Sequence, residues 1–268
     1  MEVSDLVALL QKMAPDLTLE TGVNFFCFHG ERACENAYSF SRIGVCVDPT
    51  EQNITAALNQ GVDLLISYHP WYHEAESLVR SQDIKLLSLH TAWDNNPEGV
   101  NFIFAKAIGL KELNLTGSVL YGQQQLTFRE FSERCQRVLD LNVLPYYGEL
   151  RAPVNKIGLW AGPGFLPVHR EIWESCHREG CDTIVSGEFT IAALRFAALH
   201  RLKLIDVGHS AVAKPGMARL AYLLRQQLQD ACGVELFLDY YGYNYNTSWF
   251  FPERGDTEES VPLFPYST

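Results

Sequence analysis

The stretch Gly61-Val62-Asp63-Leu64-Leu65-Ile66-Ser67-Tyr68-His69-Pro70 is a short apolar run that leads directly into a histidine and a proline. Residues 64–67 predict a buried β-strand, because a continuous apolar run of this length is typical of a strand in a parallel sheet. Open α/β sheets bind their ligands beyond the carboxyl ends of their strands. His69 is therefore a candidate ligand for a metal or a substrate.

Two further metal-binding side chains follow predicted strands at similar positions. Asp94 lies just beyond the apolar run 86–89, and His209 follows the run 204–208. Imidazole and carboxylate groups bind divalent transition metals, and two imidazoles with one carboxylate leave coordination positions open. An open site of this kind can activate water near neutral pH. The alternative is that each side chain only caps or hydrogen-bonds a loop.

Several nearby residues are candidates for supporting roles around such a site. His90 lies four residues before Asp94, and we expect it to orient that carboxylate, with direct metal binding as the alternative. His73 and Glu74 follow the first candidate histidine closely, and they either line the same cleft or belong to a solvated loop. Glu188 comes soon after another predicted strand and either projects into the cleft or caps the next helix.

The composition indicates a globular protein with a substantial core. Of the 268 residues, 47% are hydrophobic and 20% are charged. The sequence lacks an apolar run of about 20 residues, and residues 1–15 lack the pattern of a signal peptide, so we expect no membrane partner. The formal net charge of −11 argues against nucleic acid as a partner. Seven cysteines without a C-x-x-C pair favour the reducing cytoplasm over a disulfide framework.

Strand patterns and helix patterns alternate along most of the chain. This alternation predicts βαβ units and an α/β fold with mostly parallel sheets. The predicted strands are 43–47, 64–67, 86–90, 157–160, 183–186, 202–207 and 235–240, and the predicted helices are 53–60, 100–108, 168–179, 191–200 and 218–229.

The segment 43–67 is echoed by the segment 157–186. Each runs from a strand through a helix to Gly-x-Asp, a second strand and a serine. The echo predicts two related three-layer α/β halves, although common βαβ units can also match by chance. The less periodic segment 116–153 is expected to hold the crossing between the halves.

The candidate residues are divided between these two predicted halves. An interleaved division of the chain is the alternative to a single boundary. The first half, residues 1–120, carries His69 and Asp94, and the second half, residues 121–268, carries Glu188 and His209.

Four short motifs occur in an order that is typical of one protein family. Ser67-Tyr68-His69-Pro70 is similar to a family motif Ser-His-His-Pro. The segment His90-Thr91-Ala92-Trp93-Asp94, followed by Gly99-Val100-Asn101, is similar to His-Thr-x-x-Asp and Gly-Val-Asn. Gly187-Glu188 and Gly208-His209 are similar to the two later motifs. Over most of its length the chain thus resembles the GTP cyclohydrolase I type II homologue family, also called Nif-three-like.

The resemblance implies a metal centre that this chain retains only in part. In the family, three histidines, one aspartate and one glutamate hold two metal ions, and the members form hexamers built from dimers. His69, Asp94 and His209 match ligands, whereas Tyr68 replaces a histidine and Ala213 replaces the glutamate. The resemblance therefore implies a homohexamer that holds at most one zinc, manganese or iron ion per chain, or none.

Two functions are compatible with this partial ligand set. The first is a metal-dependent hydrolase that acts on a small phosphorylated or nucleotide-like substrate. The second is a non-catalytic oligomeric scaffold or ligand-binding protein that has lost the dinuclear metal site. The three retained ligands favour metal binding, while the two replaced ligands leave open whether the protein is an enzyme.

Overall fold

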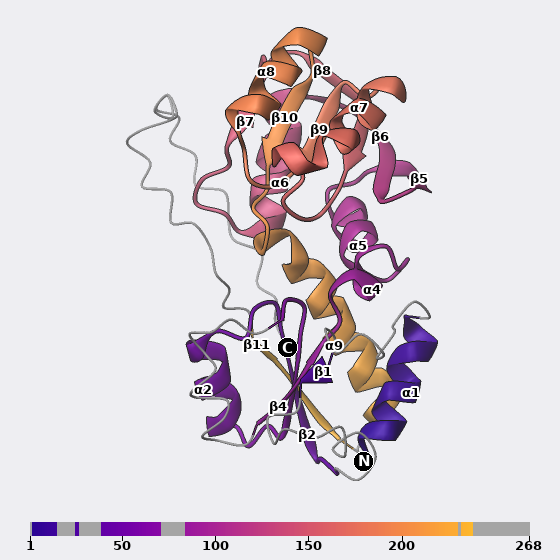
Figure 1. Ribbon diagram of the computed structural model, residues 1–268, viewed down its shortest axis with the longest axis vertical. Coiled ribbons are helices and arrows are strands. Elements are labelled where there is room, and N and C mark those ends of the chain that lie inside the picture. Colours follow the sequence, from indigo (N-terminus) through magenta and orange to yellow (C-terminus); the bar gives the residue numbers. More distant parts are fainter. Residues whose placement is uncertain (1, 15–24, 27–38, 71–83, 230–231, 238–268) are drawn as a thin grey trace.

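The computed structural model describes residues 2–14, 25–26, 39–70, 84–229 and 232–237 of the chain. This part of the chain forms two α/β halves, which lie one beyond the other along the longest axis of the molecule (Figure 1). No helix among the described residues combines the length and the apolar character that a bilayer-spanning segment needs.

The first half is built on a five-stranded sheet with the order β1-β4-β3-β2-β11. Strands β4, β3, β2 and β11 run parallel, and β1 pairs with β4 in the antiparallel direction. Leu64 and Ile66 of β3 belong to one hydrophobic cluster with α1 and α9, whereas Leu65 belongs to a second cluster with α2. The apolar run therefore covers both faces of a buried sheet, as is typical of parallel strands. The elements are α1 (Val3–Met13), β1 (Phe25–Phe26), β2 (Arg42–Cys46), α2 (Glu51–Asn59), β3 (Leu64–Ser67), β4 (Lys85–Ser88), α4 (His90–Asp94), α5 (Val100–Ala107), α9 (Lys214–Leu228) and β11 (Gly233–Phe237).

The second half is built on a six-stranded sheet with the order β5-β6-β8-β9-β10-β7. Its centre, β8-β9-β10, is parallel, and the strands on either side of this centre pair in the antiparallel direction. Val185 of β9 clusters with α6, and the preceding Ile184 clusters with α7 and α8, so helices cover both faces. The elements are β5 (Lys111–Thr116), β6 (Val119–Thr127), α6 (Phe128–Leu139), β7 (Tyr146–Tyr147), β8 (Pro153–Leu159), η2 (Pro167–His169), α7 (Arg170–Arg178), β9 (Thr183–Ser186), α8 (Ile191–His200), β10 (Lys203–Asp206) and η3 (Ala211–Ala213).

The prediction of two α/β halves is confirmed, and the sheets interleave along the chain. Strand β5 already belongs to the second sheet, and after η3 the chain returns through α9 to place β11 beside β2 in the first sheet. The segment 116–153 was expected to hold the crossing, and this expectation is wrong, because the segment supplies β6, α6 and β7 of the second half. Strand β6 changes from continuous burial to alternating burial along its length, which explains why its sequence has no single period.

The repeated Gly-x-Asp motif has the same structural role in both halves. Oδ2 of Asp63 accepts hydrogen bonds from the backbone N–H groups of Ser41 and Arg42, over 2.7 and 3.0 Å. Oδ2 of Asp182 accepts one from the backbone N–H of Asn155 over 2.8 Å. In each half, the aspartate thus links the start of the second strand of the unit to the start of the first. The sequence echo therefore corresponds to a repeated βαβ structure.

Substitution of Asp63 by alanine tests this structural role through its pH dependence. Partial burial raises the pKa of the Asp63 carboxyl, but hydrogen bonds from Ser41 and Arg42 outweigh burial and lower the pKa from its ordinary value. The stabilisation is therefore complete above the unfolded-state pKa and is lost as the pH falls through the folded-state pKa. We expect Asp63→Ala to lower the free energy of unfolding by about 1–2 kcal/mol at neutral pH.

Denaturant melts at about pH 7 and about pH 3 measure this difference on either side of the ordinary carboxyl pKa. The difference between wild type and variant should shrink at the lower pH. Glu149→Ala, which removes an exposed carboxyl, is the control. If the difference in the free energy of unfolding is equal at both pH values, the charge of Asp63 does not stabilise the link between the two strands.

Candidate metal centre

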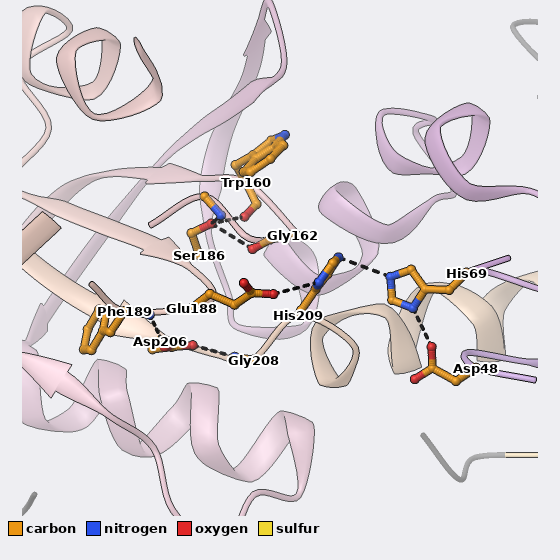
Figure 2. Close-up of polar contacts among 11 residues, drawn as sticks. Asp48, His69, Trp160, Gly162, Ser186, Glu188, Phe189, Asp206, Gly208 and His209 are labelled. Carbon is orange, nitrogen blue, oxygen red and sulfur yellow. Dashed lines mark hydrogen bonds and ion pairs between the residues drawn. The ribbon is translucent and has the colours of Figure 1, made fainter. Parts of the chain in front are cut away.

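The candidate site lies where the carboxyl ends of strands from the two sheets meet. His69 follows β3 and His90 follows β4 in the first half, and His209 follows β10 in the second half. Nε2 of His69 lies 3.2 Å from Nε2 of His209, so the site joins the two halves (Figure 2). This is the edge at which open α/β sheets place their ligands.

A buried carboxylate holds the imidazole ring of His69. Nδ1 of His69 lies 2.6 Å from Oδ1 of Asp48, and the two side chains are 3% and 0% exposed. Asp48 comes two residues after the end of β2, which is the strand next to β3. From this contact we assign the Nδ1–H tautomer to His69, which leaves Nε2 with a free lone pair.

A second carboxylate holds His209 in the same manner. Nδ1 of His209 lies 3.0 Å from Oε1 of Glu188, which follows β9 (Figure 2). Glu188 has a φ of +66°, in the left-handed region that few non-glycine residues adopt. Asp206 stabilises the surrounding turns, because its carboxylate accepts hydrogen bonds from the backbone N–H groups of Phe189 and Gly208. Glu188 therefore projects toward the site, as one of the two sequence hypotheses expected.

The Nε2 atoms of His69 and His209 face each other, and this arrangement favours a positively charged ion between them. When both rings are neutral and both Nδ1–H groups donate to carboxylates, both Nε2 atoms carry lone pairs, which repel at 3.2 Å unless a proton or a metal ion lies between them. Two nitrogens bound to one tetrahedral ion at about 2.0–2.1 Å would lie about 3.3 Å apart. The separation of His69 and His209 therefore fits two ligands of a single metal ion. Burial and the neighbouring His69 lower the pKa of His209, which favours the neutral imidazole that metals bind.

His90 is the third histidine of the site. In the described part of the chain, the donor atoms of His69, His90 and His209 lie within 4.8 Å of one another. Burial lowers the pKa of His90 to about 4, with a further lowering from the positive charge that His69 and His209 carry when protonated, so the ring of His90 is neutral at pH 7. The sequence had favoured an orienting role for His90, and the structure instead brings it into the group of candidate ligands.

Asp94, which the sequence predicted to be a ligand, is engaged in a different contact. The hydroxyl of Tyr68 donates a hydrogen bond to Oδ1 of Asp94, and Tyr68 is 1% exposed. Burial raises the pKa of Asp94 to about 6, although the Tyr68 hydrogen bond and His69 partly offset this effect. Burial and the Asp94 charge raise the pKa of Tyr68 well above its ordinary value, so Tyr68 is a neutral donor. Asp94 does not belong to the group of three histidines that the described residues form.

The remaining residues that the sequence singled out add no ligand among the described residues. His73 and Glu74 lie outside the described residues. Ala213 lies in η3 with its side chain fully buried in the core, where it offers no metal ligand. Sequence reasoning missed Asp48, although this residue comes just after the predicted strand 43–47, as His69 comes just after its own strand.

The chain is similar in sequence and in fold to known proteins. A family model described as Duf34/NIF3 (NGG1p interacting factor 3) matches residues 1–240 of the chain. A protein of Clostridium perfringens named GTP cyclohydrolase 1 type 2 homolog is 21% identical over an alignment of 252 residues, and the match covers 85% of this chain and 93% of that protein.

Two solved structures have a similar fold. A hypothetical protein from Staphylococcus aureus matches with a TM-score of 0.74 and 21% identity, over 94% of this chain and 99% of its own. Reduced HcgD from Methanocaldococcus jannaschii matches with a TM-score of 0.71 and 19% identity, over 88% of this chain and 97% of its own. At this level of identity, the matches show a shared fold.

Proposed function

The chain belongs to the Duf34/NIF3 family, and from this premise we propose that it binds one divalent transition metal between its two halves. The observation that carries the proposal is the 3.2 Å separation of the Nε2 atoms of His69 and His209. Each of these rings is oriented by a carboxylate on its Nδ1 atom, which is the arrangement that metal-binding histidines commonly have.

The donor set of the site supports zinc, iron or manganese as the bound ion. His69 and His209 would hold the ion, together with one ligand supplied by the segment 90–94. Imidazole ligands suit zinc and iron, and a carboxylate ligand would favour manganese more. A bound ion of this kind would act as a Lewis acid, which polarises a phosphoryl oxygen and makes water more acidic.

We further propose that the protein is a hydrolase of a small phosphorylated or nucleotide-like molecule. Three protein ligands leave coordination positions open for water and substrate, as catalytic metal sites require. The name GTP cyclohydrolase 1 type 2 homolog, given to the Clostridium perfringens relative, supports a nucleotide-like substrate class. Asp48 and Glu188 would serve by keeping the two histidine rings in the orientation that exposes their Nε2 atoms.

A hydrolysis assay tests this function. Protein loaded with zinc, manganese or iron and protein treated with chelator are incubated with nucleoside triphosphates and phosphomonoesters, and released phosphate is measured. We expect turnover in a loaded sample and a loss of about 100-fold or more after chelation or in His209→Ala. His177→Ala, which removes an exposed histidine on α7, is the matched control. Metal-loaded protein that releases no phosphate from these substrates would contradict a hydrolase of phosphate ester and anhydride bonds.

A non-catalytic oligomeric scaffold is the second candidate function. It is favoured by the contact between Tyr68 and Asp94, because this contact pairs two buried polar side chains without a metal. The resemblance to the family supports a homohexamer. The five described cysteines are buried free thiols, which supports a cytoplasmic location.

Chelation separates the scaffold from the metal protein. If the protein is only a scaffold, chelator should change neither the oligomer mass in light scattering nor the melting temperature. A metal that binds only the native state stabilises it, by about 4 kcal/mol when its concentration is about 1,000 times its Kd. A large drop in melting temperature on chelation would therefore exclude the scaffold and support the metal protein.

A further inference from the structure

The described residues hold two candidates for the third metal ligand, and they are His90 and Asp94. They lie at the two ends of the short helix α4, four residues apart, so they share one face of the helix. A single ion that is already held by His69 and His209 needs only one of them to complete three protein ligands. The contacts of each side chain decide between the two.

We infer, building on the proposed metal binding, that His90 is the third ligand and that the hydroxyl of Tyr68 holds Asp94 away from the metal. The result is a site of three histidines in place of the family's mixture of histidines and carboxylates. His90 thus takes the ligand role that the family motif would give to Asp94.

The position of His90 supports the first part of this inference. Its donor atom lies within 4.8 Å of the donor atoms of both other histidines. Its ring centroid lies 5.4 Å from that of His69 and 5.0 Å from that of Tyr68, with the Tyr68 ring inclined by only 26°. Tyr68 thus stacks on His90 and limits the directions in which the imidazole can point.

The contacts of Tyr68 support the second part. This side chain is almost fully buried, and its hydroxyl donates to Oδ1 of Asp94. In this orientation Asp94 lies outside the group of donor atoms that the three histidines form. Turning the carboxylate toward that group would draw Oδ1 away from the Tyr68 hydroxyl, and a buried hydroxyl that loses its acceptor is left unsatisfied, which is unfavourable. The same tyrosine therefore stacks on one candidate ligand and engages the other.

A site of three histidines has a defined preference for ligands. Three neutral imidazoles leave the full double charge on a divalent ion, whereas a carboxylate ligand would neutralise half of it. The open positions should therefore attract anionic oxygen, as in a phosphate group, more strongly than a site with Asp94 bound. The softer donor set should also favour zinc over manganese.

Titration of the metal-free protein with Zn²⁺ and Co²⁺ in a calorimeter tests the assignment. We expect His90→Ala to weaken the Kd for both ions by about 100-fold or more, because loss of a ligand should exceed the 10- to 100-fold effect of losing an outer partner. Asp94→Asn keeps an acceptor for the Tyr68 hydroxyl and should change the Kd by less than about 3-fold. His90→Gln repeats the first measurement with a larger side chain, and melting temperatures in chelator monitor folding.

A third variant examines the role of the tyrosine. In Tyr68→Phe, Asp94 loses its hydrogen-bond donor and becomes available to the ion. Asp94→Asn should therefore weaken metal binding about 10-fold or more in the Tyr68→Phe protein, although it has little effect in the wild type. If Asp94→Asn changes the metal Kd by the same factor in the wild type and in the Tyr68→Phe protein, Tyr68 does not hold Asp94 away from the metal.

The Co²⁺ protein provides a readout that is independent of affinity. Each histidine bound through one ring nitrogen gives a shifted, exchangeable N–H resonance in the proton NMR spectrum. We expect three such resonances in the wild type and two in His90→Ala. Two in the wild type, with a large affinity loss in Asp94→Asn, would overturn the inference while leaving the proposed metal binding in place. A wild-type protein that binds neither ion would instead overturn the proposed function itself.

Discussion

Replacing His69 by alanine should abolish the binding of divalent transition metal. His69 is almost fully buried, its Nδ1 atom is held by Asp48, and its Nε2 atom faces His209 at 3.2 Å. The variant therefore removes a ligand that is already oriented for binding. We expect the Kd for Zn²⁺, measured by calorimetry on metal-free protein, to rise by at least about 100-fold.

Two controls separate metal loss from a folding defect in this experiment. His177→Ala removes an exposed histidine elsewhere in the second half and should bind Zn²⁺ as the wild type does. His69→Gln retains a polar group beside Asp48, so it tests whether a change in that buried contact alone explains the result. If His69→Ala binds Zn²⁺ with wild-type affinity, the site lies elsewhere.

Replacement of Trp93 by alanine is expected to cause a large loss of stability. Trp93 lies in α4, is fully buried, and its Nε1–H donates to the carbonyl oxygen of Gly216 in α9 over 3.1 Å. Truncation of a buried tryptophan costs about 3–5 kcal/mol, because it removes apolar contacts and leaves a cavity. Since α4 also carries His90, the variant should bind metal more weakly than the wild type even where it is folded.

The variant Trp93→Phe divides this effect into packing and hydrogen bonding. It keeps most of the apolar volume but leaves the carbonyl of Gly216 without its indole donor, so we expect a loss of about 1–3 kcal/mol. Denaturant melts of the metal-free proteins measure both variants. Equal destabilisation by alanine and by phenylalanine would show that packing of the ring contributes little, which would contradict the burial of Trp93.

The sequence predicts the strand ends of the site well, because the physical signal there is local. A buried apolar run followed by a histidine identifies His69 and His209, and the structure brings their rings together. The Gly-x-Asp echo likewise predicts two related halves, since both aspartates link neighbouring strands. The same local signal was present at Asp48, just after β2, and a search of every strand end would have found it.

The sequence predicted Asp94 as a ligand and favoured an orienting role for His90, but spacing alone cannot decide between them, because the choice depends on contacts between elements. Both residues lie on α4, and their spacing suits either as a ligand. The contact that supports the inference for His90 is made by the hydroxyl of Tyr68, which follows a different strand, β3. Local sequence patterns also do not predict how the two sheets interleave, since nothing in the pattern of β11 specifies β2 as its neighbour.

Elemental analysis of the untagged protein, purified without chelator, tests the central claim most directly. The claim is that His69 and His209, with one further ligand, hold a single metal ion between the two halves. We predict about one zinc, iron or manganese ion per chain, either as purified or after reconstitution. No bound metal after reconstitution with each of the three ions would contradict the claim and leave the oligomeric scaffold as the function to pursue.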